Sequence, residues 1–324
     1  MKITVIDDYQ DAFRRMTSFA LLKDHQVTVY NDTEKDPEKL AARLNGAEVA
    51  LLTQQRSRFP RELIEKLPAS LKLIAQTGKQ VSHIDVAACT AKGIAVASKG
   101  GGSPYSTAEL AWGLILASVR NIPFEAQQLK QGSWQTTIGT GLHGKTLGVF
   151  ALGKIGSCVA QVGKAFGMRV TCWGRDATKA KALALGYEVP DSRAAFFAGA
   201  DVISLHIPLN PETRGIVTAA DLAQMKASAL LVNTSRAPLV QEGALVAAAK
   251  QGRPGRVAVD VYEDEPVIGG HHPLLKMDNV LCTPHLGYVT LDGYENLYRA
   301  AIESVVGFAA GKPLNVINPE ALAK

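Results

Sequence analysis

One segment limits the fold more than any other: an apolar run that passes through a glycine-rich turn into a helix-like stretch. The run covers Thr146 to Phe150, the turn reads Ala151-Leu152-Gly153-Lys154-Ile155-Gly156, and the stretch continues to Phe166. A strand, a tight turn and a helix in this order present backbone N–H groups that bind a pyrophosphate. The segment predicts a dinucleotide site, with a glycine-rich turn that binds nothing as the alternative.

The residues of this turn have separate tasks. Gly153 lets the backbone approach the phosphates, and Gly156 lets the helix pack closely on the strand. The first position, where glycine is usual, is Ala151. A methyl group is tolerated there if φ stays negative, so the turn is a weakened fingerprint. The helical spacing that follows rests on the apolar residues Ile155, Val159, Val162 and Phe166.

The end of the next predicted strand bears on the choice of dinucleotide. That strand, Arg169 to Trp173, leads into Gly174, Arg175 and Asp176. In NAD sites the residue at this strand end is an acid that binds the ribose hydroxyls and repels a 2′-phosphate. Glycine followed by arginine predicts an NADP preference, with NAD possible, and assigns the phosphate to Arg175. In the alternative, Arg175 is a solvated charge and Asp176 binds the ribose.

Polar residues follow several later apolar runs. In sequence order they are His206, Pro208 and Thr213, then Thr234, Ser235 and Arg236, then Asp260 and Glu265, and finally His285. A lone His or Arg after a strand is usually structural. In open parallel sheets, however, ligands bind outside the carboxyl ends of the strands, so we expect these residues to converge on one crevice.

These segments supply a dinucleotide site, a guanidinium, a carboxylate and an imidazole, as hydride transfer to a carboxylate-bearing carbonyl requires. On them the chain resembles the D-2-hydroxyacid dehydrogenase family over nearly its whole length. Further matches are Arg56-Ser57-Arg58, Leu71-Lys72-Leu73-Ile74 leading to Gly78 and Ile84-Asp85, Ser106-Thr107-Ala108-Glu109, Arg120-Asn121-Ile122-Pro123, Gly132-Ser133-Trp134 and Pro313-Leu314-Asn315-Val316-Ile317-Asn318.

The resemblance implies that Arg236, Glu265 and His285 are catalytic. The planar fork of Arg236 suits a carboxylate with an adjacent carbonyl, which a lysine could not hold in the same way. His285 would protonate the carbonyl oxygen in reduction and take the proton back in oxidation. A carboxylate beside this imidazole favours its charged form and fixes its tautomer. Asp260 would accept a hydrogen bond from the nicotinamide carboxamide.

The resemblance also implies the binding residues. The expected cofactor ligands are Thr107, Gly153, Lys154, Ile155, Gly156, Gly174, Arg175, His206, Pro208, Thr213, Thr234, Ser235, Asp260 and Gly287. The expected substrate ligands are Arg56, Gly78, Lys79 and Gln80. Where the family usually has Gly-x-Gly this chain has Gly78-Lys79-Gln80, and Ser82, Ala237 and Tyr288 are further departures. The identity of the substrate is therefore open.

Length and rhythm predict the fold class. The chain has 324 residues and 47% hydrophobic content, which suffices for two cores. Predicted strands at 3–6, 27–30, 49–53, 73–75 and 94–97 alternate with helix-like stretches such as 37–44 and 60–67. Such alternation predicts an α/β fold with doubly wound parallel sheets.

The family resemblance further implies how the domains are arranged. A Rossmann NAD(P)-binding domain at 102–290 would be inserted in a flavodoxin-like substrate domain at 1–101 and 291–324, to which a C-terminal helix at about 292–310 returns. The segment Lys99-Gly100-Gly101-Gly102-Ser103-Pro104 is a hinge candidate together with 288–293, or else an ordinary loop. The resemblance also implies a homodimer to which the helix after the first crossing contributes.

Other features narrow the options. There is no apolar run near the ~18 residues of a membrane span, and acids follow the N-terminus too soon for a signal peptide. The cysteines, at 89, 158, 172 and 282, have no paired spacing, so we expect reduced thiols in a cytoplasmic protein. We expect no metal, because His271-His272 is better explained as a loop. A net charge of +5 suits anionic substrates and cofactors better than nucleic acid.

Together these observations predict an oxidoreductase that transfers a hydride between NAD(P)H and a small 2-oxo acid or D-2-hydroxy acid. The glyoxylate or hydroxypyruvate type is the expected substrate class. One alternative is a dinucleotide-sensing binding protein, since some relatives of the family act as corepressors. Another is a dehydrogenase of a donor that is not a hydroxy acid, such as formate or phosphite.

Overall fold

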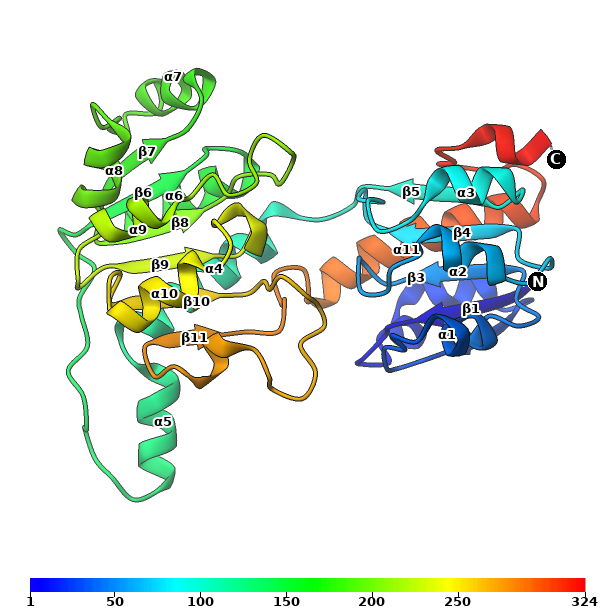
Figure 1. Cartoon of the computed structure of the whole chain (residues 1–324), viewed down its shortest axis with the longest axis horizontal. Helices are drawn as coiled ribbons and strands as arrows, with labels where there is room; N and C mark the ends of the chain where they lie inside the picture. The colour runs from blue at the N-terminus through cyan, green and yellow to red at the C-terminus, as the bar shows by residue number, and fades with distance from the viewer. Residues whose placement is uncertain (324) are drawn as a thin grey trace. The chain divides into compact units, whose positions relative to one another are not determined.

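The computed structural model describes residues 1–323 and divides into two compact units (Figure 1). One comprises Met1–Ser103 and the segment from Val289 onward, and the other is Pro104–Tyr288. Each unit contains one sheet in which every strand pair is parallel, so the predicted α/β class with two doubly wound parallel sheets is confirmed. Within residues 1–323, no helix combines the length and the apolarity needed to cross a bilayer.

The sheet of the first unit has the order β2-β1-β3-β4-β5. Its strands are β1 (Lys2–Ile6), β2 (Gln26–Val29), β3 (Val49–Leu52), β4 (Leu73–Thr77) and β5 (Ala95–Lys99). Its helices are α1 (Pro37–Arg43), α2 (Arg61–Lys66), α3 (Val86–Ala91), α11 (Leu291–Ala309) and the short 3-10 helices η1 (Phe13–Arg15), η2 (Thr17–Leu22) and η5 (Pro319–Ala323). This is the flavodoxin-like strand order.

Burial explains why these strands read as continuous apolar runs. Every residue of β3 and β4 is buried, as in parallel sheets whose two faces are covered. Leu40 of α1, Leu63 of α2 and Ala88 of α3 join one core with the sheet. Helix α11 packs against β4 and β5. The carboxyl ends of β3 and β4 are therefore held rigidly, and the loops that follow them carry the predicted substrate residues.

The sheet of the second unit has the order β11-β10-β9-β8-β6-β7. Its strands are β6 (Thr146–Phe150), β7 (Arg169–Trp173), β8 (Val202–Leu205), β9 (Leu230–Asn233), β10 (Arg256–Val259) and β11 (Val280–Cys282). Its helices are α4 (Pro104–Val119), α5 (Ile122–Lys130), α6 (Lys154–Ala165), α7 (Asp176–Ala184), α8 (Arg193–Gly199), α9 (Ala219–Gln224), α10 (Ala244–Gln251), η3 (Ala237–Leu239) and η4 (Pro273–Lys276).

Strand order fixes where a ligand can bind in this unit. The order reverses between β6 and β8, and in such sheets the crevice lies outside the carboxyl ends of the strands at that point. A single parallel bridge between Thr171 and Glu188 extends the sheet beyond β7. The third strand of the Rossmann order is thus reduced here to one residue pair.

Helix α6 buries small residues, which differs from the face that its apolar spacing indicates. Its buried residues are Gly156, Val159, Ala160 and Gly163, whereas Val162 and Phe166 are 37% and 42% exposed. A Cβ at Gly163 would lie 2.5 Å from Leu147 Cδ2 of β6. The helix therefore approaches the strand too closely for large side chains on that face.

Candidate functional site

The glycine turn is closed on one side and open on the other. A Cβ at Gly156 would lie 2.2 Å from the carbonyl oxygen of Ala151, so only glycine fits there. A Cβ at Gly153 would meet no atom within 4 Å. The turn thus has the close packing and the free approach that a pyrophosphate needs. The condition of a negative φ at Ala151 is not met, because its φ is 73°.

A cavity of about 600 Å³ opens beside this turn, at the carboxyl ends of β6, β7 and β8. Its lining includes the predicted cofactor residues Gly153, Gly174, Arg175, His206, Pro208 and Thr213. The loop after β8 is shaped by Thr213, whose hydroxyl donates to the carbonyl of Pro208 at 2.7 Å. Lys154 and Ile155 begin α6 at the same turn.

The residues after β7 separate the two cofactor hypotheses. Gly174 has a φ of 154°, a conformation that favours glycine. Arg175 is exposed and lines the cavity. The Asp176 side chain is fully exposed, does not line the cavity, and lies 3.9 Å from Lys179 Nζ. Of these two residues, therefore, only Arg175 lines the cavity.

Helix α7 also contributes residues that the sequence pattern did not indicate. Thr178 and Lys181 line the cavity one and two turns after Gly174. Lys181 Nζ donates to the carbonyl of Leu152 at 3.0 Å and to Ser157 Oγ at 2.9 Å. The ammonium therefore ties α7 to the glycine turn. Positions one helical turn apart share a face, and this spacing after Gly174 was the available signal.

Two buried polar atoms at predicted cofactor residues have no partner among residues 1–323. One is Nδ1 of His206, whose Nε2 lies 2.9 Å from Ser204 Oγ, and the other is the Thr234 hydroxyl. Burial lowers the pKa of His206 to about 4, so its ring is neutral at pH 7. Buried polar groups are normally hydrogen-bonded. These two atoms are therefore suited to a bound polar ligand, and the residues fit a dinucleotide.

The three predicted catalytic residues follow β9, β10 and β11, which are neighbours in the sheet. His285 Nδ1 lies 2.6 Å from Glu265 Oε2, and the two side chains are 17% and 16% exposed. Glu265 Oε1 accepts the backbone N–H of Tyr262 at 2.9 Å. The half-buried Arg236 donates through Nη1 to the carbonyl of Ser235 at 2.7 Å.

Asp260 holds the segment that carries His285. Its Oδ1 accepts from Thr283 Oγ1 at 2.6 Å and from the N–H of Leu286 at 2.7 Å, while Oδ2 accepts the N–H of Gly287 at 2.9 Å. Burial raises the pKa of this carboxyl, and these hydrogen bonds and the charge of His285 oppose that effect. Thr107 of α4 joins the same segment, since its hydroxyl donates to the Gly287 carbonyl at 2.9 Å.

Ser235, another predicted cofactor residue, is held in the loop after β9. Its hydroxyl donates to the carbonyl of Leu205 at 2.8 Å, and its N–H donates to Asn233 Oδ1 at 3.0 Å. Asn233 Nδ2 in turn donates to the carbonyl of Arg236 at 3.0 Å. The ends of β8 and β9 and the loop that bears Arg236 therefore form one connected network.

The predicted substrate residues lie in the first unit, after β3 and β4. Arg56 is buried, and Gly78 has a φ of 88°. The Ser98 hydroxyl donates to the carbonyls of Gly78 and Lys79 at 3.0 and 3.1 Å. His83 Nε2 lies 3.2 Å from Gln76 Oε1. The loop that begins at Gly78 is thus fixed by side chains that the sequence pattern did not single out.

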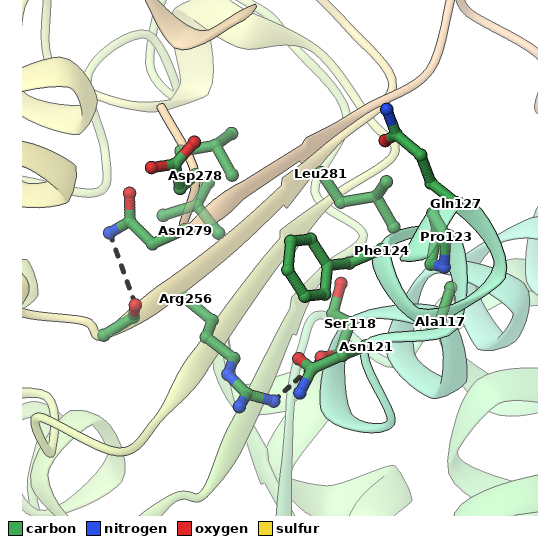
Figure 2. Close-up of a pocket in the computed structure, with 13 residues that line it drawn as sticks. Ala117, Ser118, Asn121, Pro123, Phe124, Gln127, Arg256, Asp278, Asn279 and Leu281 are labelled. Atoms are coloured by element: carbon green, nitrogen blue, oxygen red, sulfur yellow. Dashed lines mark hydrogen bonds between the residues drawn. The ribbon is translucent and has the colours of Figure 1, made fainter. Parts of the chain in front are cut away.

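A second cavity, of about 500 Å³, lies beside α5 (Figure 2). Figure 2 shows Phe124 and Asn121 on the helix side of it, opposite Leu281 of β11. Helix α5 buries none of its residues. Glu125 fixes the segment that follows, because its carboxylate accepts from the hydroxyls of Thr136 and Thr137. We call α5 and the segment that follows it, residues 122–138, the arm. Large apolar side chains on the arm are exposed: Ile122, Phe124, Leu129, Trp134 and Ile138.

The histidines, cysteines and acidic residues that the structure describes do not form a metal site. His272 Nε2 lies 2.9 Å from Glu263 Oε2, and no group of three or more His, Cys, Asp or Glu in the described part of the chain is placed to bind a metal ion. Cys89, Cys158, Cys172 and Cys282 are all free thiols.

Known proteins resemble this chain in sequence and in structure. Residues 112–287 match the family model described as D-isomer specific 2-hydroxyacid dehydrogenase, NAD binding domain. A glyoxylate reductase of Aeropyrum pernix is 35% identical over 311 residues, which cover 93% of this chain and 92% of that protein. A D-3-phosphoglycerate dehydrogenase of Methanocaldococcus jannaschii is 39% identical over 284 residues, 87% of this chain and 53% of that protein.

The fold is equally close to solved structures. A phosphoglycerate oxidoreductase of Vibrio cholerae superposes with a TM-score of 0.92 at 47% identity, covering 96% of this chain and 99% of that one. Among the relatives found by sequence, the chain spans about half the length of the phosphoglycerate dehydrogenases that it matches. It spans nearly all of the glyoxylate reductase.

Proposed function

The chain belongs to the D-isomer specific 2-hydroxyacid dehydrogenases, a family of oxidoreductases, and on that premise we propose that it reduces a small 2-oxo acid with a nicotinamide dinucleotide. The observation that carries this proposal is the 2.6 Å contact between His285 and Glu265, at the carboxyl edge of the sheet that also bears the glycine turn. A proton donor and a dinucleotide site on one sheet edge are what carbonyl reduction needs.

Arg236 binds and polarises the substrate in this proposal. A 2-oxo acid presents a carboxylate next to a carbonyl, and a guanidinium can donate to both with parallel N–H groups. The loop that ends β9 supports this role, because Asn233 Nδ2 fixes the Arg236 carbonyl. The substrate is thereby oriented before proton transfer begins.

His285 supplies the proton. An ionised carboxylate only accepts hydrogen bonds, so the imidazole donates through Nδ1 to Glu265. Nε2 is the ring nitrogen that we assign to the substrate oxygen. The bound nicotinamide supplies or accepts the hydride, while the protein supplies orientation and charge. Glu265, itself held by the Tyr262 N–H, orients the imidazole and fixes its tautomer.

We assign the substrate to the glyoxylate or hydroxypyruvate type. The backbone of the loop Gly78-Lys79-Gln80 and the guanidinium of Arg56 supply donors for a carboxylate. The carbonyls of Gly78 and Lys79 are held by Ser98, which fixes the backbone of this loop. The similarity to a glyoxylate reductase over 93% of the chain supports the assignment.

NADP is the proposed cofactor, with NAD possible. Gly174 removes the acid that would repel a 2′-phosphate, and Arg175 lines the cavity where that phosphate would lie. A charge-assisted hydrogen bond from a guanidinium contributes roughly 1.5–3 kcal/mol. The proposal therefore expects NADPH to bind about tenfold to a hundredfold more tightly than NADH.

A homodimer is the proposed assembly, and the cytoplasm is the proposed location. The exposed apolar side chains of the arm and the cavity beside Phe124 suit burial against a second copy. The free cysteines suit a reducing compartment. Light scattering on wild type and Trp134→Asp tests the assembly: we expect a dimer that dissociates in the variant, and a monomeric wild type would refute it.

Absorbance of the reduced nicotinamide tests the activity. The panel contains glyoxylate, hydroxypyruvate, pyruvate, 3-phosphohydroxypyruvate, and formate and phosphite as oxidisable donors, each with both cofactors. We expect turnover with glyoxylate and hydroxypyruvate that His285→Asn abolishes. The His285–Glu265 pair favours this class over formate, whose oxidation needs no proton acceptor. Binding of dinucleotide without turnover of any acid would instead support the sensing alternative.

A further inference from the structure

Gly174 faces the side chain of Thr178 across the start of α7. A Cβ built at Gly174 would lie 3.0 Å from both Cβ and Oγ1 of Thr178 and 3.1 Å from its Cγ2. Carbon atoms in ordinary contact are separated by about 3.5–4.0 Å. A side chain at position 174 would therefore press on Thr178, which would have to move by a few tenths of an ångström.

Rotation of Thr178 does not remove this close contact. The Thr178 Cβ is itself one of the atoms at 3.0 Å, and its position does not depend on χ1. The φ of 154° at Gly174 adds a second obstacle, since residues with a side chain rarely adopt it. An acid at position 174 would require α7 to shift, and Lys181 anchors this helix to the carbonyl of Leu152.

The Thr178 hydroxyl occupies the space that such an acid would enter. Thr178 lines the 600 Å³ cavity and is half-buried. Its hydroxyl has no hydrogen-bond partner among the residues that the structure describes. A hydroxyl can donate to a phosphate oxygen, whereas an acid in the same place would repel it.

We propose that Thr178 determines cofactor specificity, by excluding an acid from position 174 and by donating its hydroxyl to the 2′-phosphate of NADP. This inference rests on the proposed function and makes selectivity a property of two residues, Gly174 and Thr178. Arg175 then adds charge to a site whose shape Thr178 sets.

Binding of NADPH and NADH, measured by fluorescence titration without substrate, tests the donor role. Thr178→Val keeps the shape of the side chain and removes the hydroxyl, while Thr178→Ser keeps the hydroxyl as the matched control. We expect NADPH binding to weaken about tenfold in the Val variant and to stay near wild type in the Ser variant. The NADH dissociation constant should change by less than about twofold in both, as expected for a group that meets only the phosphate.

The outcomes separate this inference from the proposed function. If wild type binds NADPH and Thr178→Val weakens both cofactors equally, or neither, the role of Thr178 is refuted and the proposed function stands. If wild type binds neither cofactor, the proposed function itself fails, and this inference fails with it.

The steric role is tested at position 174. Gly174→Asp alone should lower Tm and fail to improve NADH binding, because the new side chain meets Thr178. In Gly174→Asp with Thr178→Ala the contacts to Oγ1 and Cγ2 are absent, so Tm should recover in part and NADH should bind more tightly than in the single variant. A Gly174→Asp protein with wild-type Tm and a full switch to NADH would contradict the two-residue mechanism.

Discussion

The Nδ1 atom of His285 lies 2.6 Å from Oε2 of Glu265, and the other oxygen of that carboxylate accepts the N–H of Tyr262. The imidazole is thus held at Nδ1 by a carboxylate that the backbone holds in turn. Asp260 fixes the same segment through the N–H groups of Leu286 and Gly287. Two separate carboxylates therefore hold the imidazole and the segment that carries it.

Replacing Glu265 with Gln should lower kcat for reduction while leaving NADPH affinity nearly unchanged. The amide can turn an N–H toward His285, so the imidazole is no longer held through Nδ1 in one orientation and one tautomer. Steady-state rates measure kcat, and NADPH titration checks that cofactor binding is retained. A Gln variant with the kcat of wild type would exclude this role of Glu265.

Arg236→Lys should lower kcat/KM about a hundredfold or more while leaving NADPH affinity nearly unchanged. The ammonium keeps the charge but loses the two parallel N–H donors. Arg169→Lys is the matched control. Arg169 is exposed, and its ion pair with Glu188, at 3.7 Å on the surface, contributes little, so we expect no effect on kcat/KM. Near-normal efficiency of the Arg236→Lys enzyme would remove Arg236 from its assigned role.

Arg175→Ala should weaken NADPH binding about tenfold to a hundredfold and change NADH binding little. Asp176→Asn is the control for the alternative in which Asp176 binds the ribose; its fully exposed side chain predicts no effect on either cofactor. Fluorescence titration of both variants measures the four constants. Tighter binding of NADH than of NADPH by wild type would overturn the proposed preference.

Ala151→Gly should stabilise the protein. Ala151 has a φ of 73°, a left-handed conformation that costs a residue with a Cβ about 1–2 kcal/mol. Glycine avoids this cost but loses about 0.5–1 kcal/mol of stability, because its unfolded chain has more conformational entropy. The expected gain is about 0.5–1 kcal/mol, visible as a rise of about 1–4 °C in Tm by calorimetry. Ala151→Val should act in the opposite direction, and a fall in Tm for the glycine variant would show that the methyl group makes favourable contacts.

Stability should fall as pH drops from about 6.5 to 4, in part because of His83. Burial lowers the pKa of His83 to about 4 in the folded chain from 6.5, so in this window the unfolded chain binds more protons. The contribution at pH 5 is a loss of about 2 kcal/mol relative to pH 7. Urea denaturation at both pH values should show a smaller loss for His83→Asn; an equal loss would mean that His83 is not the group that titrates.

The strands and the glycine turn could be predicted because each depends on a local pattern. Buried parallel strands are continuous apolar runs, as at 49–52, and the ligand edge follows from strand order alone. Only the residue types of Glu265 and His285 hinted at their contact. They are 20 positions apart in the sequence, and they meet because they follow the neighbouring strands β10 and β11. The family resemblance identified these two residues as a pair, whereas hydrophobic periodicity carried no information about them.

Other features depend on three-dimensional contacts that a sequence pattern does not contain. Hydrophobic spacing correctly placed Val159 on the packed face of α6 but also placed Val162 and Phe166 there. Close approach to Leu147 gives the rest of that face to glycine and alanine. The positive φ of Ala151 is set by the turn around it and not by its residue type. Thr178 had only its helical spacing after Gly174 as a signal, because its proposed role depends on what lies opposite the missing Cβ of Gly174.

The bond from Lys181 to the Leu152 carbonyl has a consequence for protein engineering. One helix, α7, carries both the cavity-lining residues Thr178 and Lys181 and the hydrogen bond that holds the glycine turn. A redesign that moves α7 to admit the other cofactor would also displace this turn. In the proposed binding mode, the nicotinamide would then be displaced as well. A change of cofactor specificity in this protein should therefore lower the turnover rate unless the hydrogen bond from Lys181 to the Leu152 carbonyl is kept.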